Sequence, residues 1–334
     1  MDTKISLALI GAKTLVGEAV LEMLAERGLP LAKVYALDDE KYEGETVSFG
    51  NLELDVAFTD DFDFENVQMV LLAAGADTAR RFVPDALAAG CAVVDFSSAY
   101  RADPAVPFYA PGVAEAMPSD GERLISVPNC TVTPLAMALA PFGKGLRRVT
   151  VATYQSVSGA GGEAMRELAE QTTALFSQRD AEVGVFAKRI AFNVLPQIGD
   201  TDGASVSAEE ASIASELRRL LGLPELVIEP TCVRVPVFFG HGWAVALELD
   251  QPVTADTVVE KLTRAGLRVV GKDDAYGPYI TPMEATGTDA VWVSRVRIDG
   301  CRVQFWLAAD NVKAGAAQAI VRGAQAMLAA GCCG

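Results

Sequence analysis

Cys130, one of six cysteines in the chain, is the candidate for covalent chemistry. It lies in the stretch VPNCTVTPLAMALA, where an apolar run gives way to a helical pattern. A thiol at a helix N-terminus loses its proton more readily, and the thiolate is the nucleophile. Backbone amides of this turn and the amide of Asn129 could stabilise an oxyanion formed beside it. The alternative is a buried cysteine that acts only as a small apolar residue.

His241 is the only histidine in the chain, and it could move a proton near neutral pH. It lies between Gly240 and Gly242, where the backbone of another segment can approach closely. Seven residues earlier, Arg234 interrupts a run of Val and Pro, and a substrate carboxylate would suit its charge. Gln155 comes at the end of another predicted strand, just before a glycine-rich turn. Each feature also has a purely structural explanation.

The stretch GAKTLVG, residues 11–17, lies between a predicted strand and a predicted helix. This is the context of a dinucleotide-binding turn, in which the first glycine permits the bend and the last lets the helix pack on the strand. A threonine takes the place of the middle glycine. The alternative is a turn that binds no ligand. The candidate cofactor contacts in this turn are Gly11, Thr14, Leu15, Val16 and Gly17.

Three acidic residues, Asp38, Asp39 and Glu40, follow the second predicted strand. In a dinucleotide-binding domain this position faces the adenosine ribose, where an acidic side chain favours a free 2′-hydroxyl and repels a 2′-phosphate. If a dinucleotide binds, the sequence therefore favours NAD over NADP. A solvated acidic loop is the competing interpretation.

Composition excludes several classes of function. The 334 residues are 51% hydrophobic and 22% charged, as in a globular protein, and the formal net charge is −16. Such a charge opposes binding to nucleic acid or an anionic membrane, while a small anion needs only a local cluster of donors. No apolar run is as long as a membrane span. The cysteines lack paired metal spacing, so we expect no metal, reduced thiols and a cytoplasmic location.

The order of predicted elements indicates two domains. Up to about residue 130, short apolar strands alternate with helices, which predicts an α/β, doubly wound Rossmann-type sheet. Longer alternating strands follow, which predict an α+β domain with a mixed sheet covered on one face. The last helix is expected to pack back on the first domain. The expected domains are residues 1–129 plus 315–334, for dinucleotide binding, and residues 130–314, for catalysis and dimerisation.

Several stretches together resemble the aspartate-semialdehyde dehydrogenase family over nearly the whole chain. They are VVDFSSAYRADPAVPFYAPGV, VPNCTVTPLAMALAPF, TYQSVSGAGGEAMREL, AKRIAFNVLPQIG, PTCVRVPVFFGHGWAVALEL and AADNVKAGAA. The resemblance implies phosphate-dependent interconversion of aspartate semialdehyde and its acyl phosphate, through a cysteine thioester and hydride transfer to NAD or NADP. It also implies a homodimer. The small-molecule substrate and phosphate are then the expected ligands.

The resemblance also implies roles for individual residues, matched by motif. Three are catalytic: Cys130 as nucleophile, His241 as acid and base, and Gln155 orienting the acyl group. Four bind substrate or phosphate, and four more line the cofactor. The substrate and phosphate ligands are Arg234 for the carboxylate, Glu209 for the amine, and Arg101 and Asn129 for phosphate; the cofactor residues are Ser158, Gly159, Gly161 and Asn311.

The chain departs from the family pattern at the cofactor and phosphate sites. Thr14 replaces a glycine, the pair that receives a 2′-phosphate is replaced by acidic residues from Asp38 onward, and Ser212 replaces a phosphate-binding lysine. Losing one charge-assisted contact costs about 1.5–3 kcal/mol, or roughly tenfold or more in affinity. Two alternatives follow: a weak or inactive paralogue that serves as a binding or scaffold protein, and an N-acetyl-glutamyl-phosphate reductase.

Overall fold

The computed structural model describes residues 4–118, 121–201, 203 and 205–333. The chain divides into two compact units, residues 1–129 with 316–334 and residues 130–315. Each unit is built around its own sheet, so the α/β fold predicted from the order of elements is confirmed.

The first unit contains a seven-stranded sheet in the order β3-β4-β2-β1-β5-β6-β7. All neighbouring strands pair in parallel except β3 and β4, which form an antiparallel hairpin. The central strands β1, β5 and β6 are almost fully buried, as expected for a parallel sheet covered on both faces. The strands are β1 Ile5–Ile10, β2 Leu31–Asp38, β3 Thr46–Phe49, β4 Leu52–Phe58, β5 Met69–Leu72, β6 Ala92–Asp95 and β7 Leu124–Ser126.

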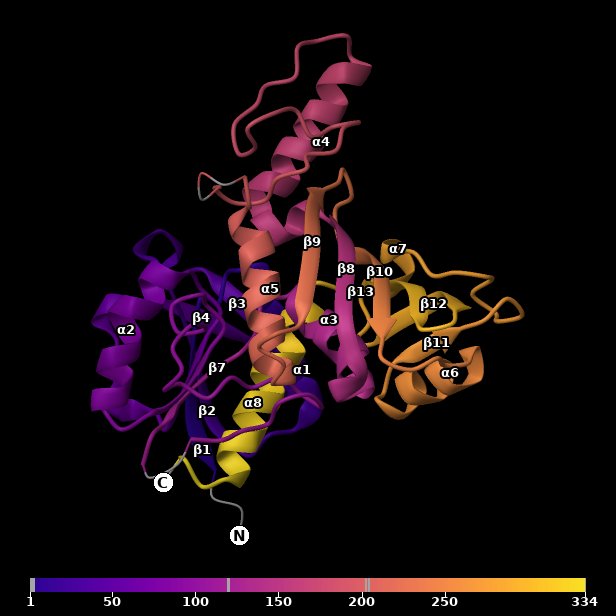
Figure 1. Cartoon of the computed structure of the whole chain (residues 1–334). Helices are drawn as coiled ribbons and strands as arrows, with labels where there is room; N and C mark the ends of the chain where they lie inside the picture. The colour runs from indigo at the N-terminus through magenta and orange to yellow at the C-terminus, as the bar shows by residue number, and fades with distance from the viewer. Residues whose placement is uncertain (1–3, 119–120, 202, 204, 334) are drawn as a thin grey trace. The chain divides into compact units, whose positions relative to one another are not determined.

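Helices cover both faces of this sheet. Helix α2 (Ala76–Ala88) packs on the face formed by residues such as Ile10 and Val70. On the other face, α8 (Gln318–Ala329) contacts β6 and also packs on α1 (Leu15–Arg27). Figure 1 shows α2 and α8 on opposite sides of the sheet. The final helix therefore belongs to the first unit.

The second unit contains a six-stranded mixed sheet in the order β11-β12-β13-β10-β8-β9. The pairs β8–β9 and β11–β12 are parallel, and the other neighbours are antiparallel. This confirms the predicted mixed sheet. Its strands are β8 Leu146–Gln155, β9 Val227–Arg234, β10 His241–Leu249, β11 Arg268–Val270, β12 Val291–Asp299 and β13 Arg302–Ala309; the helices are α3 Val132–Leu139, α4 Gly162–Phe176, α5 Ala208–Leu221, α6 Ala255–Arg264 and α7 Pro282–Ala285.

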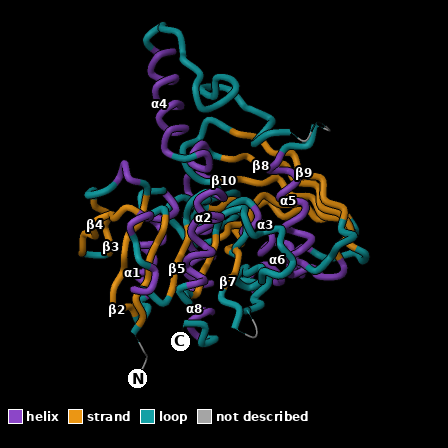
Figure 2. The backbone as a smooth tube through the Cα atoms, turned by 90° about the vertical axis from the view of Figure 1, so that its left-hand side faces the viewer, coloured by secondary structure: helices purple, strands orange, loops and turns teal. Residues whose placement is uncertain are grey.

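The two faces of the six-stranded sheet differ in exposure. Val149, Val151, Trp243 and Val245 are buried on one face, against which the helices of the unit pack. Their neighbours along the strands, such as Tyr154, point to the other face, which is open to solvent. Figures 1 and 2 show α4 projecting beyond the end of β8, with the loop that follows it returning alongside.

Short 3-10 and π-helical turns connect these elements. None of the helices in the described part of the chain is long and apolar enough to cross a membrane. The turns are η1 Glu40–Tyr42, η2 Thr59–Asp61, η3 Phe64–Asn66, η4 Ala140–Gly145, η5 Val157–Ala160 and η6 Lys313–Ala317.

Candidate active site

Strand register brings three of the predicted site residues to the same level of the six-stranded sheet. Gln155 at the end of β8 pairs directly with Arg234 at the end of β9. On the other side of β8, Gly242 of β10 pairs with Tyr154, so His241 lies one position further along, beside Gln155. Because side chains alternate along a strand, all three point to the covered face. Residues distant in sequence thus form one row.

Gln155 joins this row to helix α5. Its Nε2 donates hydrogen bonds to Glu209 Oε1 at 3.0 Å and to Thr153 Oγ1 at 3.2 Å. Glu209 lies in the first turn of α5, which begins at a capping box formed by Ser207 and Glu210. The cap fixes the start of the helix and therefore the level at which Glu209 meets the sheet.

Arg234 is a buried cation, with only 6% of its surface exposed. Its Nη1 donates to the carbonyl of Ser156 at 2.8 Å. Burial lowers the pKa of Arg234, while negative charge on Glu209 and on Cys130 raises it. Arginine nevertheless stays protonated in proteins. The structure therefore holds a permanent positive charge within electrostatic range of Cys130 and Glu209.

His241 is fully buried, and burial lowers its pKa to about 3, with the charge of Arg234 adding to the effect. The imidazole is therefore neutral at physiological pH. Its Nδ1 accepts from the backbone amide of Ser156 at 3.2 Å. Its Nε2 has no hydrogen-bond partner among the described residues. A buried nitrogen of this kind is costly unless a ligand uses it.

Gly159 packs closely against these two side chains. A Cβ built at Gly159 would lie 3.0 Å from Arg234 Nη1 and 3.4 Å from His241 Nε2. Both distances are at or below ordinary contact, so any side chain at this position would press on both groups. The absence of a side chain therefore lets the backbone of Gly159 lie beside both the guanidinium and the imidazole.

Cys130 lies at the start of helix α3, as predicted, directly before the N-cap residue Thr131. The hydroxyl of Thr131 makes no capping hydrogen bond. Gly315 packs against the cysteine, since a Cβ there would lie 2.7 Å from the Cys130 carbonyl oxygen and 3.0 Å from its Cβ. The thiol position is thus fixed by a glycine contact as well as by the helix start.

A buried polar network lies behind His241, and Ser156 is its member that sequence reasoning misses. Asn311 Oδ1 accepts from the amide of Gly240 at 3.0 Å, and its Nδ2 donates to Ser158 Oγ at 3.1 Å. The hydroxyls of Ser156 and Ser158 are 3.0 Å apart, and Ser156 Oγ lies 3.1 Å from His241 Nδ1. A polar residue directly after Gln155, at the end of a buried strand, is the signal that points to it.

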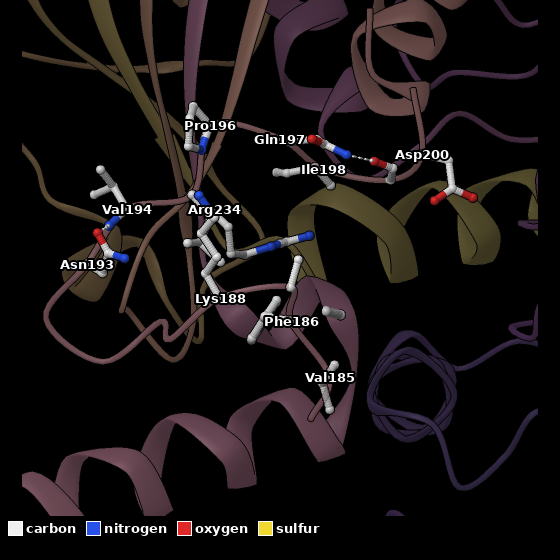
Figure 3. A pocket seen from close by; sticks show the side chains of 14 residues that line it. Val185, Phe186, Lys188, Asn193, Val194, Pro196, Gln197, Ile198, Asp200 and Arg234 are labelled. Atoms are coloured by element: carbon white, nitrogen blue, oxygen red, sulfur yellow. Dashed lines mark hydrogen bonds between the residues drawn. The ribbon is translucent and has the colours of Figure 1, made fainter. Parts of the chain in front are cut away.

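A cavity of about 630 Å³ adjoins Arg234 in the second unit. Figure 3 shows the Arg234 side chain among residues of the 185–200 loop, whose Gln197 amide bonds the carbonyl of Gly199 at 3.1 Å. The cavity has cationic, amide and carboxylate groups on its walls. Its polar side chains are Lys188, Asn193, Gln197, Asp200 and Arg234.

The glycine turn of the first unit has the geometry that close backbone approach requires. Gly11 has φ of +85°, and a Cβ there would lie 2.7 Å from the carbonyl oxygen of Ala73. A Cβ on Gly17 would lie 2.1 Å from the carbonyl oxygen of Gly11. Thr14 has φ of −78° and caps α1, because its hydroxyl accepts from the amide of Gly17. The threonine therefore fits without strain where the family has glycine.

A second cavity, of about 360 Å³, opens beside this turn. Asp38 is buried at its edge and accepts from the backbone amides of Lys13 at 2.7 Å and Asp39 at 2.8 Å. Across the cavity, Arg81 of α2 forms an ion pair with Asp60. The charged groups that line it are Asp38, Asp39, Asp60, Asp77 and Arg81.

Arg101 is anchored in the first unit by backbone carbonyls. Its Nε donates to Val127 at 3.0 Å, and its Nη2 donates to Phe96. Asp95 is buried at the end of β6, and its carboxylate accepts hydrogen bonds from the amide and the hydroxyl of Ser97, which follows that strand. Asn129 is the last residue of this unit in the first part of the chain.

The remaining predicted positions are also placed. Leu15 and Val16 form the first turn of α1, and Gly161 is the N-cap of α4 with φ of +89°. The hydroxyl of Ser212 donates to Glu216 one turn further along α5. Groups of three or more His, Cys, Asp or Glu side chains that could hold a metal ion are absent from the described residues.

Both units of the chain match known protein families. Residues 6–119 match the semialdehyde dehydrogenase NAD binding domain, and residues 136–313 match the semialdehyde dehydrogenase dimerisation domain. Aspartate-semialdehyde dehydrogenase of Rickettsia conorii is 39% identical over 95% of this chain and 96% of that protein. The chain belongs to the aspartate-semialdehyde dehydrogenase family.

Other members of the aspartate-semialdehyde dehydrogenase family match equally broadly. The protein of that name from Legionella pneumophila is 38% identical over 95% of this chain and 94% of its own length. Among solved structures, aspartate semialdehyde dehydrogenase II of Vibrio cholerae, complexed with ASA, has a TM-score of 0.91. It is 34% identical and covers 98% of this chain and 99% of its own. The resemblance stated from motifs is thereby confirmed.

Proposed function

We propose that this chain catalyses the phosphate-dependent oxidation of aspartate semialdehyde to β-aspartyl phosphate and the reverse reduction. The row of Gln155, Arg234 and His241 on three neighbouring strands carries the proposal, because it places an amide, a fixed cation and an imidazole together on one covered face. Relatives named aspartate-semialdehyde dehydrogenase that match over nearly the full chain support the same reaction.

Cys130 is the proposed nucleophile. Its thiolate sulfur would attack the aldehyde carbon, and the carbonyl oxygen would take up the resulting negative charge. Loss of hydride from that carbon leaves a thioester. A phosphate oxygen then attacks the thioester carbonyl, and the Cys130 thiolate leaves as the acyl phosphate forms. Splitting the reaction in this way avoids a direct displacement of hydride by phosphate.

Three groups of the second unit suit the substrate. Arg234 would hold the carboxylate through a charge-assisted pair, which is strong where the cation is already desolvated. Glu209 offers a carboxylate for the substrate amine, and its bond to Gln155 Nε2 ties the two groups together. Gln155 would orient the acyl group.

The residues of the first unit fit a nicotinamide dinucleotide, which supplies the hydride acceptor when bound. The close approach of Gly11 to Ala73 leaves no room for a side chain at the turn, as phosphate cradles require. Gly11, Thr14, Leu15, Val16 and Gly17 would hold the pyrophosphate, with α1 directing its N-terminus toward it. From the second unit, the proposed cofactor residues are Ser158, Gly159, Gly161 and Asn311.

The cavity beside the turn favours NAD over NADP. Four carboxylates line it, and Asp60 already pairs with its arginine, Arg81. A 2′-phosphate brought near these groups would meet repulsion without a free cation to balance it. Asp38 would accept from the ribose hydroxyls instead.

Phosphate is the second substrate in the oxidative direction. Arg101 and Asn129 are its proposed ligands, and no positive charge comes from position 212, where Ser212 bonds Glu216. The anchoring of Arg101 by two carbonyls limits the motion of its guanidinium. A pre-positioned guanidinium loses less entropy on binding an anion.

A homodimer is proposed through the exposed face of the six-stranded sheet, because the matching family model is a dimerisation domain. Tyr154 and Trp306 contact each other on this face, with ring centroids 5.5 Å apart. Aromatic residues on an open sheet face are typical of interfaces. Light scattering should then give twice the chain mass of 35.2 kDa.

The assay that tests the proposal mixes the purified protein with aspartate semialdehyde, phosphate and NAD. The absorbance of reduced nicotinamide should rise only when all three are present. A parallel reaction with the N-acetylated glutamate semialdehyde should be much slower. No absorbance change with either NAD or NADP would refute the proposed activity.

A further inference from the structure

The hydrogen bonds around His241 fix the position of its proton. A backbone amide can only donate, so the 3.2 Å contact from the Ser156 amide requires an unprotonated Nδ1. A neutral imidazole carries one proton, which must then be on Nε2. The ring is fully buried, so bulk water cannot hydrogen-bond an Nδ1 proton and offset its repulsion by the Ser156 amide.

The network behind the ring can take the same polarity. Asn311 Nδ2 donates to Ser158 Oγ at 3.1 Å, Ser158 Oγ lies 3.0 Å from Ser156 Oγ, and Ser156 Oγ lies 3.1 Å from Nδ1. Both hydroxyls also lie 3.2 Å from Asn311 Oδ1, which is a second acceptor for them. The backbone amide of Ser156 selects between the two arrangements, because it favours the series of donors that ends on Nδ1. Asn311 is itself fixed, because its Oδ1 accepts from the amide of Gly240 at 3.0 Å.

We propose that Ser156, Ser158 and Asn311 are positioning residues that hold His241 as the tautomer protonated on Nε2. The consequence for mechanism rests on the proposed function: the imidazole meets the substrate as a hydrogen-bond donor. As the thiolate adds to the aldehyde, the carbonyl oxygen gains negative charge, and the Nε2–H bond stabilises it. The neutral ring is then an electrophile rather than the partner of a thiolate–imidazolium pair.

The surroundings of Nε2 agree with this assignment. His241 Nε2 has no partner in the described residues, and the absence of a side chain at Gly159 avoids close contact with Nε2 and with Arg234 Nη1. An Nε2 proton and the guanidinium would both donate to a substrate bound at this point. Two donors suit an anionic substrate with a developing oxyanion, whereas an unprotonated Nε2 would offer only a lone pair.

Nitrogen NMR of the resting protein tests the tautomer directly. With ¹⁵N-labelled histidine, the chain gives signals from one imidazole only, since His241 is its single histidine. The expected spectrum near neutral pH has a protonated-type Nε2 and an unprotonated-type Nδ1. A protonated Nδ1, whose proton the carbonyl of Gly240 could accept, would overturn the assignment. Averaged shifts that indicate no preferred tautomer would overturn it as well.

Variants test the positioning roles. Ser156→Ala removes the hydroxyl but keeps the amide, and should raise the Nδ1-protonated population roughly two- to tenfold, the effect of one neutral hydrogen bond. Ser158→Ala should also raise the Nδ1-protonated population, but by a smaller factor. Ser215→Ala removes an exposed hydroxyl of α5 that bonds a local carbonyl and should change nothing. Unchanged spectra in both Ser156→Ala and Ser158→Ala would show that the hydroxyls do not position the ring.

This readout separates the tautomer from the proposed function, because it needs no substrate. A protein with an Nε2 proton and no dehydrogenase activity would leave the tautomer assignment intact and refute the function. An active enzyme with the proton on Nδ1 would refute the tautomer assignment and leave the proposed function intact.

Discussion

Gln155 and Arg234 are direct partners in the parallel ladder between β8 and β9, although 79 residues separate them in sequence. The pairing places an amide and a guanidinium side by side on the covered face of the sheet. Both residues end their strands, and parallel strands present their carboxyl ends at one edge, where binding groups gather. The predictions below concern the groups that this pairing assembles.

Gly159→Ala tests the close approach of the Gly159 backbone to Arg234 and His241. The new Cβ would lie 3.0 Å from Arg234 Nη1, so the guanidinium must move or the substrate must give way. Activity with aspartate semialdehyde should fall by tenfold or more, since displacements of about 1 Å can cost a hundredfold. Gly162→Ala is the matched control, because a Cβ there meets nothing within 4 Å. Equal activity of the two variants would show that this close packing at Gly159 is not needed for activity.

Asp60→Asn tests the basis of cofactor preference. Removing the carboxylate frees the Arg81 guanidinium inside the cavity, where it can meet a 2′-phosphate. The affinity for NADP relative to NAD should rise roughly tenfold, the effect of one charge-assisted contact. Isothermal titration with both dinucleotides measures it. Asp85→Asn, on the same helix as Arg81 but outside this cavity, is the control. A preference for NADP in the unaltered protein would contradict the account.

The depressed pKa of His241, about 3 against 6.5 for a free histidine, predicts a pH dependence of stability. Between these two values the unfolded chain binds a proton that the folded chain does not. The free energy of unfolding should therefore fall as pH drops from about 6 toward 4, by up to about 1.4 kcal/mol per pH unit from this group. Urea titrations should show a shallower fall in His241→Gln. Equal slopes would mean that the histidine is not buried neutral.

Thiol reactivity should separate Cys130 from the buried cysteines. Burial raises the pKa of Cys232 to about 12 and also raises the pKa of Cys91. Neither should form a thiolate near neutral pH, so iodoacetamide should modify Cys130 well before these two. Mass spectrometry of tryptic peptides after a short exposure measures the order. Loss of activity that follows modification of Cys232 instead would contradict the assignment of the nucleophile.

The local patterns of the first unit are predictable because they are strong and short-range. The apolar run of β1, the turn at Gly11 and the end of α1 at Gly28 follow from periodicity and from the need for positive φ, which is +85° and +63° in the two glycines. The hairpin of β3 and β4 is not among the expected elements, although Leu52, Leu54 and Val56 alternate with polar residues as in a half-buried strand.

The site is less accessible from sequence than the fold, because it depends on register. Motif resemblance identifies Arg234 and His241 as candidates, but only the pairing of β8 with β9 and β10 brings them to one level. Ser156 shows the limit most clearly. Its contact with His241 spans 85 residues and involves a backbone amide as well as the hydroxyl, so the polar residue type after Gln155 does not by itself predict the partner.

Trapping the acyl-enzyme tests covalent catalysis most directly. The protein is incubated with aspartate semialdehyde and NAD, without phosphate, and its peptides are analysed by mass spectrometry. The account predicts an aspartyl thioester on Cys130, absent from Cys130→Ser, that disappears when phosphate is added. Reduced nicotinamide formed without any adduct on Cys130, or an adduct that phosphate does not release, would contradict it.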